Sequence, residues 1–110
     1  AGLSLEAHMS DVKFSGQVAL VTGASRGIGA AIAHELAHQG LIVIGTATSA
    51  EGAAKVDAAL KAVPGAGAGS RGAVLDVNDV AACDALVDEI VKAQGSLHVL
   101  VNNAGITRDM

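Results

Sequence analysis

The stretch VALVTGASRGIG, residues 18–29, decides the fold of this 110-residue chain. Its opening run, Val18–Thr22, is almost entirely apolar, which is typical of a strand whose sheet is covered by helices on both faces. Three glycines follow: Gly23 permits a tight turn, Gly27 lets the backbone approach a pyrophosphate, and Gly29 lets a helix pack closely on the strand. A strand before these glycines and a helix after them favour a dinucleotide-binding loop over a merely flexible turn.

Three further apolar runs follow this loop and alternate with helical patterns. They span Leu41–Thr46, Gly72–Val77 and Leu97–Asn102. Strands that alternate with helices in this way form parallel sheets. The sequence therefore predicts an α/β fold, a Rossmann-type doubly wound parallel sheet with strands in the order 3-2-1-4 and three helices.

The first predicted helix carries an apolar stripe and, on the opposite side, two histidines with the spacing of a metal-binding motif. Ile28, Ile32 and Leu36 recur every four residues, and Gly40 follows as the stop. The same helix contains H-E-x-x-H between His34 and His38, the spacing of two zinc ligands. At 100° per residue both imidazoles lie opposite the apolar stripe, on the solvent face, so we expect a polar surface and no metal site.

The second and third predicted helices have clear end signals. Thr48 and Glu51 have the spacing of a capping box at the start of the second helix. Asn78 or Asp79 caps the third, and Gly95 terminates it. The predicted buried stripes are Ala53, Val56, Leu60 and Val63 in the second helix, and Val80, Cys83, Val87, Ile90 and Val91 in the third. The lone cysteine is thus expected to be a buried structural thiol.

Composition excludes several classes of protein. Hydrophobic residues make up 51% of the chain and charged residues 16%, so a disordered or charge-rich chain is excluded. The net charge of −4 without a basic cluster argues against a nucleic-acid partner. No apolar run approaches the ~20 residues that cross a bilayer, so we expect no membrane partner and a cytoplasmic protein. Residues 1–8 lack periodicity and are interpreted as the remnant of an expression tag.

The end of the second predicted strand indicates which nicotinamide cofactor the loop prefers. In adenosine-binding folds of this kind an acidic residue there holds the ribose 2′-hydroxyl. Here no carboxylate precedes Glu51, while Thr48 can donate to a 2′-phosphate and Arg26 offers a cation. The sequence favours NADP(H) over NAD(H). The alternative interpretations are a solvated surface side chain for Arg26 and a simple helix cap for Thr48.

The ends of the third and fourth predicted strands supply the remaining candidate contacts. The Asp76 carboxylate can accept from the exocyclic amine of adenine, and the Val77 amide can donate to the ring. At the fourth strand, small residues in Asn102–Gly105 permit close approach of the nicotinamide ribose. Asparagine side chains there also bridge strands, and both roles are compatible with Asn103.

These segments together resemble the classical short-chain dehydrogenase/reductase superfamily over nearly all of the chain after residue 8. Within it, Gly45–Ser49 and Asn102–Asp109 are similar to bacterial 3-oxoacyl-(acyl-carrier-protein) reductases of type II fatty acid synthesis. The resemblance implies NADPH-dependent reduction of a β-ketoacyl thioester on acyl carrier protein to the (R)-β-hydroxyacyl form, by a cytoplasmic homotetramer. The implied cofactor contacts are Gly23, Ala24, Ser25, Arg26, Ile28, Thr48, Asp76, Val77, Asn103 and Gly105.

The chain differs from that family because it lacks the family's catalytic residues. The family's catalytic asparagine, serine, tyrosine and lysine all follow the part represented here, and the chain contains no tyrosine. Residues 9–110 are therefore interpreted as the N-terminal NADP-binding half of one Rossmann domain, without catalytic residues of its own. The alternatives are an acetoacetyl-CoA reductase or another short-chain dehydrogenase, and, from a different class, a non-catalytic NADP-binding sensor.

Overall fold

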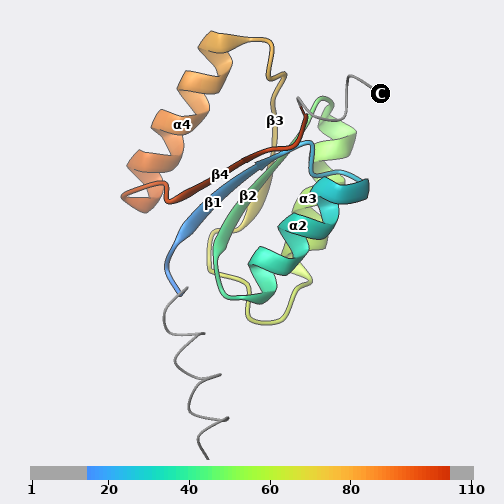
Figure 1. The fold of residues 1–110 in the computed structure, drawn as a ribbon, viewed down its shortest axis with the longest axis vertical. Coiled ribbons are helices and arrows are strands. Elements are labelled where there is room, and N and C mark those ends of the chain that lie inside the picture. The colour runs from blue at the N-terminus through green and yellow to red at the C-terminus, as the bar shows by residue number, and fades with distance from the viewer. Residues whose placement is uncertain (1–14, 105–110) are drawn as a thin grey trace, which may run out of the picture.

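A sheet of four parallel strands, in the order β3-β2-β1-β4, forms the centre of the computed structural model (Figure 1). The structure describes residues 15–104. Its elements are β1 (Val18–Thr22), α2 (Gly27–His38), β2 (Ile42–Ala47), α3 (Ala50–Lys61), β3 (Arg71–Val74), α4 (Val80–Gln94) and β4 (Val99–Asn102). The Rossmann-type order and the parallel direction predicted from the sequence are confirmed.

Helices cover both faces of the sheet, as Figure 1 shows, with α2 and α3 on one side and α4 on the other. The α2 and α3 side buries Ala19, Val21 and Val43 from the strands against α-helical side chains such as Val56 and Leu60. The α4 side buries Val18, Leu20, Ile44 and Leu75 against Leu86 and Ile90. Residues of β1 alternate between these two clusters, and all five are buried, which explains why the strand is apolar almost throughout.

Strand boundaries differ slightly from the prediction. β1 has the predicted bounds, whereas β3 ends at Val74 and β4 begins at Val99. After β3, the Leu75 amide still donates to the Ala47 carbonyl at 2.9 Å, but an Asp76 carboxylate oxygen then accepts from the Asn78 amide at 2.9 Å. This local turn ends the strand three residues before its predicted end at Val77.

The predicted face of the first helix is partly wrong. α2 buries Gly29, Ala33 and Ala37, while Ile28 is 66% exposed. Ile32 and Leu36 are half-buried at the edge of the core. Small residues face the sheet because they let the helix axis approach it closely, so the stripe of large side chains is rotated from the true inner face. The predicted stop is confirmed: Gly40 has φ 97° and follows the last turn.

The cap of α3 corrects one prediction, and the cap of α4 decides between two predicted alternatives. Ser49, and not Thr48, is the N-cap of α3, and its hydroxyl accepts from the Gly52 amide at 3.0 Å. Asp79 caps α4 by accepting from Ala82 at 3.0 Å, which settles the choice between Asn78 and Asp79. Gly95 ends α4 in the left-handed conformation, as predicted.

The buried stripe of α3 is confirmed, but that of α4 is shifted. Ala53, Val56, Leu60 and Val63 are buried on the α3 side of the sheet. On α4, Leu86 is buried where the sequence analysis did not place it, whereas Val80 and Val91 are 70% and 40% exposed. α4 carries apolar side chains on more than one face, so periodicity alone does not define its phase. Cys83 is half-buried, with its Sγ 3.7 Å from the Val77 carbonyl oxygen.

The four imidazoles of the sequence take different positions. His34 and His38 are exposed on α2, as the helix phase predicts, with their rings stacked 6.5 Å apart. His98 has a partner that the sequence did not indicate: its Nδ1 accepts from the Val18 amide at 3.0 Å, beside the start of β4. His8, with the rest of the 1–8 segment interpreted as a tag remnant, lies outside the described residues.

Among residues 15–104, no helix is long and apolar enough to cross a bilayer. No group of three or more potential metal-ligating side chains occurs among these residues either.

Candidate functional site

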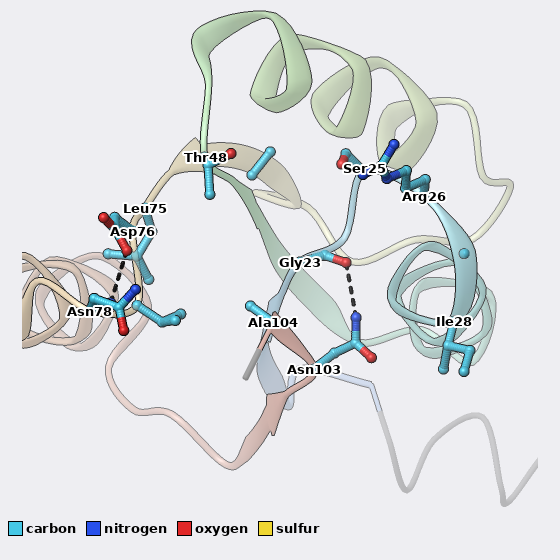
Figure 2. Close-up of a pocket in the computed structure, with 13 residues that line it drawn as sticks. Gly23, Ser25, Arg26, Ile28, Thr48, Leu75, Asp76, Asn78, Asn103 and Ala104 are labelled. Atoms are coloured by element: carbon cyan, nitrogen blue, oxygen red, sulfur yellow. Dashed lines mark hydrogen bonds between the residues drawn. The ribbon is translucent and has the colours of Figure 1, made fainter. Parts of the chain in front are cut away.

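A cleft of about 560 Å³ opens at the carboxyl ends of the strands. Its volume is within the usual range of small-molecule sites, and the carboxyl edge is where open α/β sheets bind ligands. Figure 2 shows how the side chains surround it, with Thr48 and Asp76 from the β2 and β3 ends opposite Ser25, Arg26 and Ile28. The lining residues are Gly23, Ser25, Arg26, Gly27, Ile28, Ala47, Thr48, Leu75, Asp76, Val77, Asn78, Asn103 and Ala104.

The glycine-rich loop presents bare backbone to this cleft. Gly27 has φ 63°, and a side chain added there would meet no atom within 4 Å, so its backbone faces open space. Gly27 and Ile28 begin α2, whose first amides have no partner within the helix and carry its positive dipole end. Free amides beside open space are suited to bind a phosphate group.

Gly29 has the opposite role, because the space that a side chain would need there is already filled by neighbouring atoms. A Cβ at this position would overlap the Gly23 carbonyl oxygen and would lie 2.6 Å from the Asn103 amide nitrogen. Only glycine lets α2 approach β1 and the end of β4 at this distance. The loop is therefore held against the sheet from both sides.

Side-chain hydrogen bonds tie the loop to the end of β4. The Asn103 side-chain amide donates to the Gly23 carbonyl at 3.1 Å, drawn as a dashed line in Figure 2. The Thr22 hydroxyl donates to the Asn102 side-chain oxygen at 3.0 Å and accepts from the Ala104 amide at 3.1 Å. Both asparagines thus bridge strands, and Asn103, only 4% exposed, also lines the cleft.

One corner of the cleft combines hydroxyl groups with a cation. Ser25, Arg26 and Thr48 all line it, and Figure 2 shows Thr48 at the start of the loop into α3, across from the other two. Within the described part of the chain, neither the Arg26 guanidinium nor the Thr48 hydroxyl has a hydrogen bond or ion pair, and Thr48 is not needed as a helix cap. Asp76 is the one acidic residue in the lining, and it follows the end of β3. The corner is suited to an anion.

The β3 end of the cleft offers a donor and an acceptor side by side. One Asp76 carboxylate oxygen accepts from the Asn78 amide at 2.9 Å, which fixes the side chain and leaves the second oxygen available. The Val77 amide makes no hydrogen bond within residues 15–104. Leu75, only 5% exposed, adds an apolar wall. An aromatic ring with an exocyclic amine would match this arrangement of groups.

The structure brings most of the predicted site residues together. Gly23, Ser25, Arg26, Ile28, Thr48, Asp76, Val77 and Asn103 all line the cleft. Ala24 does not: it is buried behind the loop, and its amide donates to the Thr46 carbonyl at 2.8 Å. Gly105 lies outside the described residues.

Gly27 lines the cleft as the loop pattern predicts for its backbone, and four further lining residues were not predicted: Ala47, Leu75, Asn78 and Ala104. Each is a sequence neighbour of a predicted residue at a strand end. Ala47, Leu75 and Ala104 carry no polar side chain that would single them out in a sequence. Their position beside Thr48, Asp76 and Asn103 was the available signal.

Comparison with known proteins places the chain in a family. The family model for short chain dehydrogenases matches residues 17–110. The chain is 49% identical over 98 residues to the 3-oxoacyl-(acyl-carrier-protein) reductase FabG of Escherichia coli, and 53% identical over 98 residues to that of Pseudomonas aeruginosa. Each alignment covers 89% of this chain but 38% of the relative's own length. The strand order, the glycine-rich loop and this sequence match lead to one conclusion: the chain belongs to the short chain dehydrogenase family.

Proposed function

We propose that this chain is the NADPH-binding, N-terminal part of a 3-oxoacyl-(acyl-carrier-protein) reductase. The observation that carries the cofactor choice is the corner formed by Ser25, Arg26 and Thr48. A carboxylate at the end of β2 would repel a 2′-phosphate, whereas two hydroxyls and a guanidinium without other partners would bind it. The relatives' name, 3-oxoacyl-(acyl-carrier-protein) reductase, supports the substrate class.

In this proposal the cofactor extends along the whole cleft. The amides of Gly27 and Ile28 and the backbone at Gly23 would face the pyrophosphate, and Ser25, Arg26 and Thr48 the 2′-phosphate. Asp76 and Val77 would bind the adenine ring. Asn103, Ala104 and Gly105 would border the ribose on the nicotinamide side.

When bound, NADPH would supply the hydride that reduces the ketone carbon of the β-ketoacyl thioester. This chain's residues bind the phosphates and the adenine and keep the loop fixed, so that they orient the cofactor. Protonation of the resulting alkoxide requires a positioned acid, and the chain has no tyrosine for that role. We therefore propose that a residue of the full-length protein outside this stretch transfers the proton. The family resemblance further implies a cytoplasmic homotetramer.

The cofactor assignment is tested by replacing Arg26 in the full-length protein. We expect Arg26→Ala to weaken NADPH binding by about 1.5 to 3 kcal/mol, the range of a hydrogen bond to a charged group, and to leave NADH binding nearly unchanged. Lys92→Ala is the matched control, because Lys92 is an exposed cation on α4 and does not line the cleft. Calorimetric titration with both nucleotides measures the effect. Equal losses for NADPH and NADH would contradict the assignment.

The substrate class is tested separately. The full-length protein should reduce acetoacetyl-acyl-carrier-protein with a higher kcat/KM than acetoacetyl-CoA. A preference for the CoA thioester would make it an acetoacetyl-CoA reductase. Binding of NADPH without turnover of either thioester would favour a cofactor-binding sensor.

A further inference from the structure

The first turn of α3 packs directly on the wall of the cleft, and a glycine makes this contact possible. A Cβ built at Gly52 would lie 2.8 Å from the Ala47 Cβ, 3.2 Å from the Ser49 hydroxyl oxygen and 3.7 Å from the Ser25 Cβ. Carbon atoms in contact are ordinarily about 3.5–4.0 Å apart, so the first of these distances requires a shift of the backbone. The Ala47 methyl group cannot move aside, because it is attached directly to the strand.

Gly52 is an unfavourable choice by local criteria. It lies inside a helix, where alanine is intrinsically preferred to glycine. Its backbone dihedral angle does not require glycine either, since Gly52 is absent from the residues with positive φ. The close approach that a Cβ would make to Ala47 and to the Ser49 hydroxyl is therefore the physical reason for glycine at this position, while Ser25 lies at an ordinary contact distance.

Two of the three residues that a Cβ at Gly52 would contact line the cleft. Ala47 and Ser25 line it, and Thr48 follows Ala47 at the same rim. Ser49, the third, holds the first turn of α3 by accepting from the Gly52 amide itself at 3.0 Å. Gly52 does not line the cleft, yet a Cβ added here would contact Ala47 on one side of the corner formed by Ser25, Arg26 and Thr48, and Ser25 on the other.

We propose that Gly52 is a positioning residue that sets the spacing of this corner and thereby the preference for a 2′-phosphate. A side chain here would push the α3 start away from Ala47 at the end of β2, and so shift Thr48 relative to the glycine-rich loop. Thr48 and Arg26 would then no longer converge on one phosphate group. The pyrophosphate and adenine positions lie at the start of α2 and after β3, which a Cβ at Gly52 would not contact, and would be little affected. This inference rests on the proposed function, because it assumes that the cofactor is NADPH.

The test is Gly52→Ala in the full-length protein, titrated with NADPH and with NADH. We expect NADPH to bind about tenfold more weakly, the equivalent of one weakened charge-assisted hydrogen bond, with NADH affinity within about threefold of wild type. Ala54→Gly is the matched control, since Ala54 is an exposed residue of the same helix. It alters helix propensity near the same turn without changing the contact with Ala47.

A rescue variant identifies the overlap as the cause. In the double variant Ala47→Gly/Gly52→Ala the overlapping methyl group of Ala47 is removed, and NADPH selectivity should return toward that of wild type. Should Gly52→Ala fail to fold, the double variant carries the test, and wild-type selectivity in it supports the role of the spacing.

Two results would overturn the inference while leaving the proposed function intact. The first is a wild-type protein that prefers NADPH together with a Gly52→Ala variant of the same preference. The second is a double variant that folds but stays as unselective as the single one. A wild-type protein without preference for NADPH would instead refute the proposed function.

Discussion

Two buried threonines on neighbouring strands allow a matched test of the side-chain hydrogen bonds that join β1 to β4. Thr22 follows Val21, which pairs with Gly45, so Thr22 lies beside Thr46 at the carboxyl edge of the sheet. They are 4% and 1% exposed. The Thr22 hydroxyl bonds to Asn102 and to the Ala104 amide, whereas the Thr46 hydroxyl has no partner within the described residues. Replacement by valine preserves the shape of either side chain and removes only its hydroxyl.

We expect opposite effects on the free energy of unfolding. Thr22→Val loses the hydrogen bonds to Asn102 and Ala104 and a longer one, at 3.4 Å, to the Val101 carbonyl. With a net contribution of about 0.5–1.5 kcal/mol from each of the two shorter bonds, the loss should be about 1–3 kcal/mol. Thr46→Val removes a buried hydroxyl that gains nothing in the fold, so stability should be unchanged or higher by about 1 kcal/mol.

The assay is urea denaturation of the full-length protein at a fixed protein concentration, followed by far-ultraviolet circular dichroism. The two variants should have the same dependence on urea as wild type and should differ in their midpoints. Equal destabilisation by the two substitutions, or a larger loss for Thr46→Val, would refute the assignment of a stabilising role to the Thr22 hydrogen bonds.

Three further predictions concern the packing of the loop, the start of β4 and the outer strand. Gly29→Ala would place a methyl group against the Gly23 carbonyl and Asn103, and should cost about 1–3 kcal/mol or more in urea denaturation; an unchanged midpoint would contradict the close packing. His98→Leu removes the acceptor of the Val18 amide and should cost about 1–3 kcal/mol, with a smaller loss for His98→Asn, which can still accept; equal losses would argue against this hydrogen bond. The hydrogen bonds that Asp57 accepts from Lys61 and from the Gly72 amide lower its pKa below 3.8, so its contribution to stability is complete above that pH and is lost as the pH falls through the lowered pKa. The stability difference between wild type and Asp57→Asn should therefore shrink between pH 7 and strongly acidic pH, and a difference independent of pH would exclude the carboxylate as its source.

The architecture was predictable because its signals are local. β1 could be bounded at both ends since an apolar run meets the glycine-rich loop directly. The stops at Gly40 and Gly95 depend on positive φ angles of 97° and 92°, which favour glycine whatever the rest of the fold does. The strand order came from the Rossmann-type fold that the glycine-rich loop and the alternation of strands and helices together indicate.

Errors arose where packing of small residues decides the outcome. Ile28 was placed on the inner face of α2 because large apolar side chains dominate a periodicity pattern. The actual contact uses Gly29, Ala33 and Ala37, whose burial depends on how closely the helix approaches the sheet. Similarly, Thr48 and Ser49 are adjacent hydroxyl residues, and only the position of the β2 end determines which of them caps α3.

The residues that line the site were more predictable than the contacts that hold them in place. Polar residues at strand ends identified most of the cleft lining, because parallel strands share one carboxyl edge. The contacts that hold the loop join residues about 80 positions apart, such as Thr22 with Asn102 and Gly23 with Asn103. No local pattern reports such pairs, since they form only once β4 has paired with β1.

These supports imply that the loop is organised before any cofactor arrives. Gly23 is held by the Asn103 side chain on one side and packs against Gly29 at the start of α2 on the other. A loop fixed in this way loses little conformational entropy when it binds a phosphate, so more of the contact energy remains as affinity. Because Asn103 directly follows β4, the same fixation makes the loop depend on the pairing of β1 with β4. Substitutions that loosen this strand pair should consequently weaken nucleotide binding even when they lie outside the cleft.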